Sequence, residues 1–148
     1  MGSTHSNLLF HLIFRTRKSS ALIDPTIQKV LYPYIDGIVK GEKADLLAIG
    51  GIEDHIHLLI RLRPTHHIPD IVRRIKGNSS KWINEKWADR ERFAWQRGYG
   101  IFSVSESNSM SIKKYIDRQE AHHKRMSFRH EYLIPLEKHP IEFDENFL

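Results

Sequence analysis

The sequence has no cysteine, no long hydrophobic run and no nucleotide-binding loop. The absence of Cys from its 148 residues excludes disulfides and thiolate metal sites and suits a cytoplasmic protein. No apolar stretch approaches the roughly 20 residues that cross a bilayer, and the N-terminus does not have the form of a secretory signal. No Walker motif or Gly-rich phosphate loop is present. We therefore expect one globular domain with no membrane partner and no nucleotide cofactor.

Positive charge is in excess, and it is unevenly distributed. The net charge is +5; residues 61–97 carry ten Lys/Arg against four Asp/Glu, and residues 113–130 carry six against two. The last stretch, 131–148, is acidic, with five Asp/Glu against one Lys. Two basic blocks indicate a polyanionic partner, most simply a nucleic acid, although long helices also carry solvated Lys and Arg.

The hydrophobic periodicity predicts an α+β fold of the ferredoxin-like kind. In that pattern, β-α-β-β-α-β plus a C-terminal helix, the first and third strands lie in the middle of an antiparallel sheet and two helices cover one face. Asp24 is expected to cap the first helix, with Pro25 in its first turn and Pro33 as a source of a kink. Strands are predicted at 6–16, 44–52, 53–64 and 99–105, and helices at 21–41, 68–87 and 108–126.

Two histidines stand one residue apart in the third predicted strand, EDHIHLLIRL. Because alternate side chains of a strand share a face, His55 and His57 point the same way and Ile56 points the other way. Two imidazoles on one face can chelate a metal ion. With ten His in the chain, one chance H-x-H pair is also expected.

The last predicted helix carries polar residues along one face. Tyr115, Gln119, His122 and His123 stand at i, i+4, i+7 and i+8. Imidazoles with an amide oxygen suit Mg²⁺ or Mn²⁺ better than Zn²⁺, and a phenol beside such a cation can act as a nucleophile. The alternative is that Tyr115 is an amphipathic residue at a helix–sheet seam and that both histidines lie on the surface.

At these residues the sequence resembles a known family. DHIHLLI followed by YIDRQ is similar to the single-tyrosine HUH transposases of the insertion-sequence 200/605 type. FHLIFRTRKS and IPDIVRRIKGNSSKWI support the resemblance. FAWQRGYGIFSVS and QEAHHK are similar to the branch that contains the repeat-associated tyrosine transposases. The resemblance extends to HHKRM, so we expect a transposase domain over 1–130 and a separate acidic tail over 131–148.

The resemblance implies a role for each site residue. His55 and His57 match the metal ligands, Gln119 matches the third ligand, and Tyr115 matches the nucleophile that becomes linked to the 5′ end of DNA. The metal in the family is Mg²⁺ or Mn²⁺, the substrate is single-stranded DNA with hairpins, and many members are homodimers. A cytoplasmic protein of the prokaryotic nucleoid is implied. Three further residues are expected as additional ligands or as partners of the ligands, namely His122, His123 and Asp54.

DNA binding requires cations and small polar side chains near the phosphates. A basic turn follows the first predicted strand, and a second basic set lies on the middle helix. The alternative for that helix is a solvated face with a tolerated Gly77. Trp95 and Tyr99 could stack on unpaired bases, although core packing is the more natural use of Trp95. The predicted DNA-binding residues are Arg15, Arg17, Lys18, Arg73, Arg74, Lys76, Asn78, Ser79, Ser80 and Lys81.

Three other functions compete with a mobile transposase. One is a domesticated relative that processes chromosomal repeats by the same chemistry. Another is a non-catalytic nucleic-acid-binding domain of the same fold, which would show Phe or Tyr where this strand has His55 and His57. The third is a metallohydrolase that activates water, with Asp54 or Glu53 as its general base.

Overall fold

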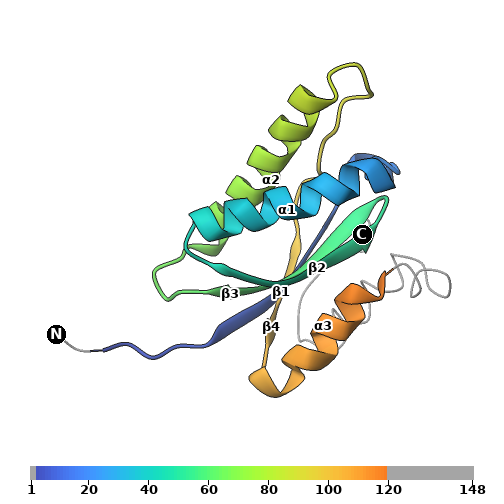
Figure 1. Cartoon of the computed structure of the whole chain (residues 1–148). Coiled ribbons are helices and arrows are strands. Elements are labelled where there is room, and N and C mark those ends of the chain that lie inside the picture. The colour runs from blue at the N-terminus through green and yellow to red at the C-terminus, as the bar shows by residue number, and fades with distance from the viewer. Residues whose placement is uncertain (1–2, 120–148) are drawn as a thin grey trace.

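Four antiparallel strands form one sheet, which lies between the helices (Figure 1). The computed structural model describes residues 3–119. The strand order is β2-β3-β1-β4, so β1 and β3 lie in the middle as the sequence predicts. The strands are β1 (Leu8–Arg15), β2 (Asp45–Ile52), β3 (His55–Leu62) and β4 (Gly100–Val104).

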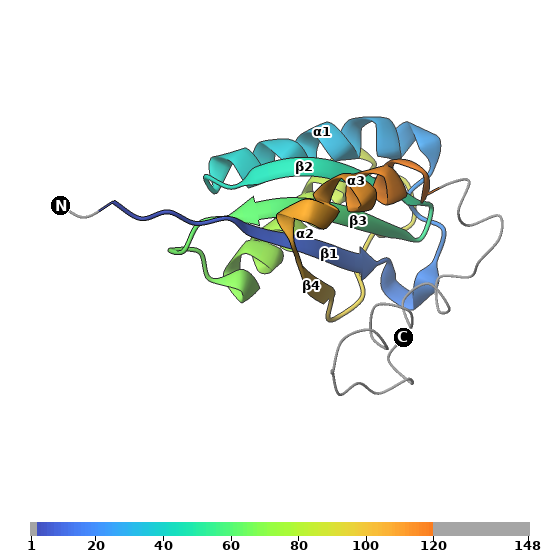
Figure 2. The same cartoon turned by 90° about the horizontal axis from the view of Figure 1, so that it is seen from below.

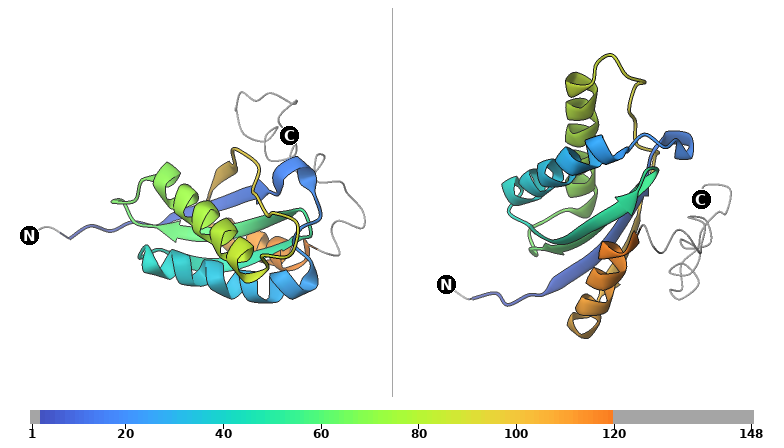
Figure 3. Two further views of the ribbon diagram at one scale, coloured as in Figure 1. Left: turned by 90° about the horizontal axis from the view of Figure 1, so that it is seen from above. Right: turned by 45° about the vertical axis from the view of Figure 1, so that its right-hand side comes forward.

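Three helices cover the two faces of this sheet unequally. They are α1 (Pro25–Gly41), α2 (Ile68–Lys86) and α3 (Ser109–Asp117). Helices α1 and α2 lie on one face and α3 lies on the other (Figure 3). Seen from below, α3 crosses over β2 and β3 (Figure 2). The predicted β-α-β-β-α-β order with an added helix is therefore confirmed.

Local signals explain where α1 begins and which side it buries. The side chain of Asp24 accepts a hydrogen bond from the backbone N–H of Ile27 at 2.9 Å, and Pro25 occupies the first turn, where its missing N–H costs nothing. The helix continues through Pro33 to Gly41 as one element. Four apolar residues at a spacing of four form its buried side, namely Ile27, Leu31, Ile35 and Val39.

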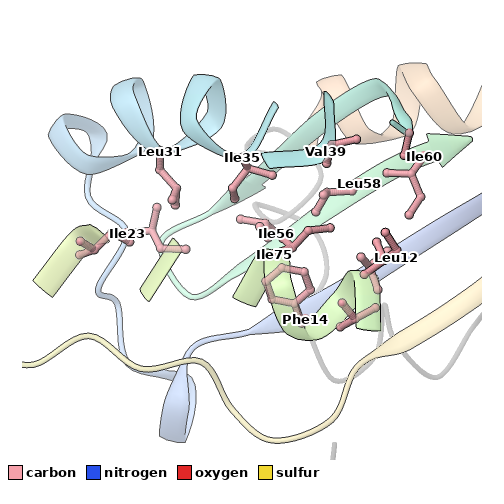
Figure 4. Close-up of a cluster of buried hydrophobic side chains, with 14 of the residues drawn as sticks. Leu12, Phe14, Ile23, Leu31, Ile35, Val39, Ile56, Leu58, Ile60 and Ile75 are labelled. Atoms are coloured by element: carbon pink, nitrogen blue, oxygen red, sulfur yellow. The ribbon is translucent and has the colours of Figure 1, made fainter. Parts of the chain in front are cut away.

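The main core fills the space between the sheet and the helices α1 and α2 (Figure 4). Alternation within the strands decides its members: Leu12 and Phe14 of β1 face the same side as Ile56 and Leu58 of β3. Helix α2 contributes Ile71, Val72, Ile75 and Ile83. The opposite face of the sheet has a much smaller apolar cluster, made by Ala48, Leu59 and Ile116.

The structure describes the predicted helix 108–126 only as far as Gln119. Helix α3 covers Ser109–Asp117, Arg118 forms a turn, Gln119 is again helical, and residues 120–126 lie outside the described residues. Asn108 precedes the helix, but its side chain makes no capping hydrogen bond; the hydroxyl of Ser109 instead donates to the carbonyl of Glu106. The predicted domain end at 130 and the acidic tail over 131–148 lie outside the described residues. Within residues 3–119, no helix combines the length and the apolar character needed to span a bilayer.

Candidate active site

The paired histidines of β3 lie on the sheet face that α3 covers. His55 and His57 have no exposed surface, and their ring centroids are 5.1 Å apart. The intervening Ile56 points into the main core on the other face, as strand alternation requires. The structure therefore confirms the predicted geometry of the pair, with both imidazoles on one face.

A third histidine, His11 of β1, completes a buried imidazole cluster. Its Nε2 atom is 2.8 Å from Nδ1 of His57, and the two rings are stacked with centroids 5.0 Å apart. The register explains the contact, because Ile13 pairs with His57 and His11 lies two residues along on the same face. The sequence reasoning did not single out this residue. Alternation within FHLIF assigns His11 to a face of β1, but nothing local reveals which strand lies beside it.

Helix α3 approaches the sheet closely because β2 has a glycine beneath it. A Cβ atom at Gly50 would overlap the carbonyl oxygen of Ile116, so the helix backbone rests where any other residue would place a side chain. Gly50 pairs with His57 across the hairpin. This contact brings the tyrosine of α3 to the imidazoles: the ring centroid of Tyr115 is 5.6 Å from that of His57, with the planes perpendicular, and 6.2 Å from that of His11.

Gln119 joins the same cluster from the helical position that follows the turn at Arg118. It is 1% exposed, and its Oε1 lies 3.3 Å from Nε2 of His55. Its Nε2 donates to the carbonyl of Tyr115 at 3.3 Å, which fixes which end of the amide faces the imidazole. The predicted placement of Tyr115 and Gln119 on one side is therefore what the structure has. His122 and His123 lie outside the described residues.

The hydrogen bonds of His55 bear on whether a cation fits beside it. Oδ1 of Asp54 is 2.7 Å from Nδ1 of His55, and a carboxylate can only accept, so the proton is on Nδ1. In the neutral ring, Nε2 then directs a lone pair at the Oε1 lone pairs of Gln119. Two lone pairs at 3.3 Å repel one another unless a proton or a metal ion lies between them. Neighbouring ligands of an octahedral Mg²⁺ at roughly 2.1 Å stand about 3 Å apart, so these donors fit such an ion.

The donor set also shows what kind of ion it suits. The described residues contain no cluster of three His, Cys, Asp or Glu side chains that could enclose a metal. The candidate ligands are two imidazoles and one amide oxygen, which leaves the remaining positions to water or substrate. Asp54 contacts His55 through the outer nitrogen and therefore orients that candidate ligand. Glu53 is exposed in the turn between β2 and β3.

The predicted DNA-binding residues fall in two places. Arg15, Arg17 and Lys18 lie at the end of β1 next to the imidazoles: Arg15 pairs with His55 across the sheet, and the other two are exposed on a single 3₁₀ turn. The basic residues of α2 lie on the opposite face of the sheet (Figure 3). Among these, Arg73 pairs with Asp70 at 3.2 Å and Arg74 with Glu42 at 2.9 Å.

Two of the α2 residues predicted to bind DNA make hydrogen bonds within the protein. Ser79 is fully buried; its hydroxyl donates to the carbonyl of Ile75 at 2.6 Å and accepts from the indole N–H of Trp95 at 2.9 Å. It lies in the row Ile75–Ser79–Ile83, a spacing that could have revealed its inward direction. Lys76 is half-buried. Its ammonium donates to the carbonyls of Gln96 and Gly98 at 2.7 and 2.8 Å, and burial lowers its pKa.

The remaining predicted contacts on and beside α2 stay exposed or half-exposed. Asn78 and Lys81 are exposed, while the hydroxyl of Ser80 donates to the carbonyl of Gly77 at 3.1 Å. Trp95 packs edge-on against Phe14 at a centroid distance of 4.7 Å, which confirms core packing as its main use.

Comparisons with known proteins agree with this fold. A solved Deinococcus radiodurans protein described as a candidate transposase superposes with a TM-score of 0.64 and 25% identity, covering 80% of this chain and 98% of that one. A repeat-associated (REP) tyrosine transposase, solved bound to a REP hairpin, gives a TM-score of 0.62 over 83% of this chain and 74% of that one. At 13% identity, this second likeness supports the fold alone. The fold is that of the tyrosine transposases.

Sequence comparison identifies the family within that class. A family model described as Transposase IS200 like matches residues 4–119, and the chain belongs to that family. The ISDra2 transposase TnpA of Deinococcus radiodurans is 28% identical over 120 residues, which are 76% of this chain and 84% of that protein. The transposase for insertion sequence element IS200 of Salmonella typhimurium is 23% identical over 124 residues, 80% of this chain and 81% of that protein. The chain is accordingly a DNA-binding protein of transposition, as its motifs predict.

Proposed function

We propose that this chain cleaves and rejoins single-stranded DNA through a 5′-phosphotyrosine on Tyr115, with a divalent metal ion held by His55, His57 and Gln119. The observation that carries the proposal is the convergence of these four side chains on one sheet face. They come from positions up to 64 residues apart, and a glycine beneath α3 makes their approach sterically feasible. A phenol, two imidazoles and an amide oxygen in one cluster are the groups that this chemistry requires.

The proposed reaction has two transesterification steps. In the first, the phenolic oxygen of Tyr115 attacks the scissile phosphorus, the bond from phosphorus to the 3′ oxygen breaks, and the departing oxygen takes up a proton as the phenol loses one. In the second, a 3′-hydroxyl attacks the phosphotyrosine and the phenol is released with its proton restored. Each step makes one P–O ester bond and breaks one. The bond energy is therefore conserved without a nucleotide, and the difficult reaction is divided into two easier steps.

The neighbouring residues have positioning roles in this proposal. In this proposal Nδ1 of His57 donates to Nε2 of His11, so that the Nε2 atom of His57 would face the metal ion with its lone pair. Asp54 holds His55 in the same tautomer. Partners of this kind orient ligand imidazoles and raise their basicity. The perpendicular contact with His57 limits the positions that the Tyr115 ring can take.

The metal, expected to be Mg²⁺ or Mn²⁺, would be held by His55, His57 and Gln119, with Asp54 and His11 behind the two imidazoles. When bound, such an ion polarises a phosphoryl oxygen and lowers the cost of ionising a nearby phenol. The amide of Gln119 supplies a neutral oxygen, so this ligand adds no negative charge that would repel a phosphodiester.

Formation of protein-linked DNA tests the proposal. The purified chain is incubated with Mg²⁺ and labelled single-stranded fragments tiled across the DNA that flanks its gene, and the products are separated on a denaturing gel. We expect a shifted, labelled protein band that Tyr115→Phe lowers by on the order of 10³-fold or more. Tyr34→Phe is the matched control, because Tyr34 stacks on Trp82 at 4.2 Å on the other side of the sheet.

Two outcomes would contradict the proposal. An unchanged band from Tyr115→Phe would remove this residue as the nucleophile. Free 5′-phosphate products without protein-linked DNA would instead indicate attack by water.

In this structure one chain supplies both the tyrosine and the imidazoles of the site. A homodimer is expected, so each site can use the tyrosine of its own chain or that of the partner chain. Mixing Tyr115→Phe protein with His57→Ala protein separates the two arrangements. If each chain builds its own site, as the 5.6 Å ring distance favours, the mixture stays inactive. Recovery of about a quarter of the wild-type activity, the share statistically expected for one intact composite site in mixed dimers, would show that chains exchange their tyrosines.

A further inference from the structure

A groove of about 780 Å³ lies between α2 and the segment 92–99, on the face of the sheet away from Tyr115. The segment returns alongside α2 before entering β4 (Figure 1). Pro69, Val72 and Phe93 contribute to the apolar part of the lining. The volume is within the range of roughly 300–1,000 Å³ that small-ligand sites occupy, which is room for a nucleotide unit rather than for a duplex.

The wall of the groove is held rigidly in place. The Lys76 ammonium bridges α2 to the carbonyls of Gln96 and Gly98. Asn84 holds Phe93 by two hydrogen bonds, donating to its carbonyl at 2.9 Å and accepting from its N–H at 2.8 Å. Four polar contacts from one helix therefore fix a segment that has no secondary structure of its own along most of its length. A preformed groove loses little entropy when a ligand binds.

Gly77 lines this groove, and no tertiary contact among residues 3–119 requires a glycine there. Gly77 lies in the interior of α2, where glycine is unfavourable. A Cβ atom built there would meet nothing within 4 Å. No contact within residues 3–119 therefore requires the missing side chain. Glycine at such a place permits close approach by the backbone of another molecule.

The charges around the groove are mostly positive and uncompensated. Lys81, Arg92 and Arg97 are exposed, and none has an ion-pair partner among residues 3–119. Glu85 is the one acid in the lining that the structure describes. Cations of this kind neutralise phosphates and release counterions. At the rim, Tyr99 is 36% exposed and offers a ring on which an unpaired base can stack.

The groove connects to the candidate active site around the end of β1. The N–H of Arg17 donates to the carbonyl of Ala94 and the N–H of Gln96 donates to the carbonyl of Arg15, both at 2.8 Å. Arg15 also donates from Nε to the side chain of Gln96 at 2.7 Å and pairs with His55 in the sheet. The exposed cations of the 3₁₀ turn, Arg17 and Lys18, thus lie between the groove and the imidazoles.

We propose that this groove binds a single-stranded segment of the DNA substrate, with a base against Tyr99, phosphates against Lys81, Arg92 and Arg97, and the sugar-phosphate backbone over Gly77. The inference rests on the proposed function only in taking DNA as the ligand. It assigns strand capture to one face of the sheet and strand cleavage to the other. The basic turn after β1 carries the strand between the two faces.

Anisotropy titrations of full-length Tyr115→Phe protein test the groove without cleavage. The probes are a fluorescent oligo-dT 20-mer and a blunt hairpin of equal length, each titrated at several salt concentrations. We expect Gly77→Gln to weaken binding of the 20-mer by about tenfold, since the added side chain blocks the close approach of the sugar-phosphate backbone. Tyr99→Ala weakens binding by a similar factor and Tyr99→Phe does not. Lys81→Ala with Arg97→Ala reduces the salt slope for the single-stranded 20-mer by about 1.4.

A matched pair of glycines separates binding from folding. Gly37 of α1 also has open space at its Cβ position, so Gly37→Gln makes the same change in another helix. We expect both Gly→Gln variants to keep or raise the Tm, and Gly77→Gln alone to lose affinity. Lys29→Ala on α1 is the control for removing a charge.

The outcomes distinguish this proposal from the proposed cleavage chemistry. Unchanged affinity in the Gly77, Tyr99 and Lys81/Arg97 variants would overturn the groove, whether or not the wild type forms protein-linked DNA. An equal loss of affinity for the 20-mer and for the hairpin would contradict the single-strand assignment and indicate that the groove binds a double-stranded stem. The variants can lose affinity for the 20-mer alone while the wild type forms no protein-linked DNA. That result would support the groove as a single-strand site and contradict Tyr115 as the nucleophile.

Discussion

The two faces of the same four-stranded sheet differ in what they bury. The face under α1 and α2 is aliphatic and aromatic, with Leu58 and Ile75 among its fully buried residues (Figure 4). The face under α3 has a small apolar cluster and, beside it, three buried imidazoles and a buried amide. Burial of polar groups without partners is costly. Here the partners are one another and Asp54.

This difference indicates how the fold supports a polar site. The large cluster on one face supplies most of the hydrophobic stabilisation, at roughly 25 cal/mol per Å² of apolar surface buried. The other face can therefore give buried positions to ligands and to a nucleophile. Consecutive residues of β3 point to opposite faces: Leu58 packs in the main core, and His57 lies in the candidate active site.

The largest contrast is expected between these two neighbours in β3. Leu58→Ala leaves a cavity in the main core and should lower the free energy of unfolding by about 2–5 kcal/mol. His57→Ala should cost clearly less stability and abolish formation of protein-linked DNA. Urea unfolding followed by circular dichroism measures the first effect, and the gel assay measures the second. Equal destabilisation by both variants would mean that the α3 face contributes to the core as much as the other face does.

Gly50→Ala tests the contact that seats α3. The added methyl group overlaps the carbonyl oxygen of Ile116, so the helix must move away and take Tyr115 with it. A displacement of about 1 Å is expected to lower the cleavage rate by on the order of 10²-fold while the main core stays folded. Gly37→Ala has open space and should stabilise the helix by about 0.5–1 kcal/mol at unchanged activity. An active Gly50→Ala protein would show that the position of α3 does not depend on its close packing against Gly50.

His11→Ala tests the partner behind His57. Removing such a partner of a metal ligand is expected to lower metal affinity by about 10–100-fold, and His11→Gln, which keeps an acceptor, should recover part of it. Calorimetric titration with Mn²⁺ reads the affinity directly, apart from any activity. A loss of Tm with unchanged Mn²⁺ affinity would assign His11 a purely structural role.

The smallest effect is expected at the other face, at the cap of α1. The pKa of Asp24 is lowered by the hydrogen bond from the Ile27 N–H, and Arg90 acts in the same direction. Asp24→Ala should therefore cost about 1 kcal/mol above the ordinary carboxyl pKa of 3.8. A lowered folded-state pKa contributes stability above the unfolded value and loses it as pH falls through the folded value. The difference between wild type and variant should shrink in that acid range, as urea titrations can check, and activity should not change.

Sequence periodicity predicted most of the elements but not all of the contacts between them. The predicted β3 and α2 end within a few residues of the observed ones, and the Asp24 cap and the inward row of α2 have local signals. No local signal in the sequence predicts the hydrogen bonds of the Lys76 ammonium or the contact between His11 and His57. Each depends on a neighbour that is distant in the chain, the carbonyls of 96 and 98 in one case and a strand 46 residues away in the other.

The sequence by itself determined which side chains share a face, because a period of two in strands and of 3.6 in helices acts over a few residues. It placed His55 with His57, and Tyr115 with Gln119. Only the tertiary structure decided that these two pairs meet each other and meet His11. These contacts require the β1–β3 register and the close packing of α3 on Gly50. Both arise from strand pairing and burial between segments that no local pattern connects.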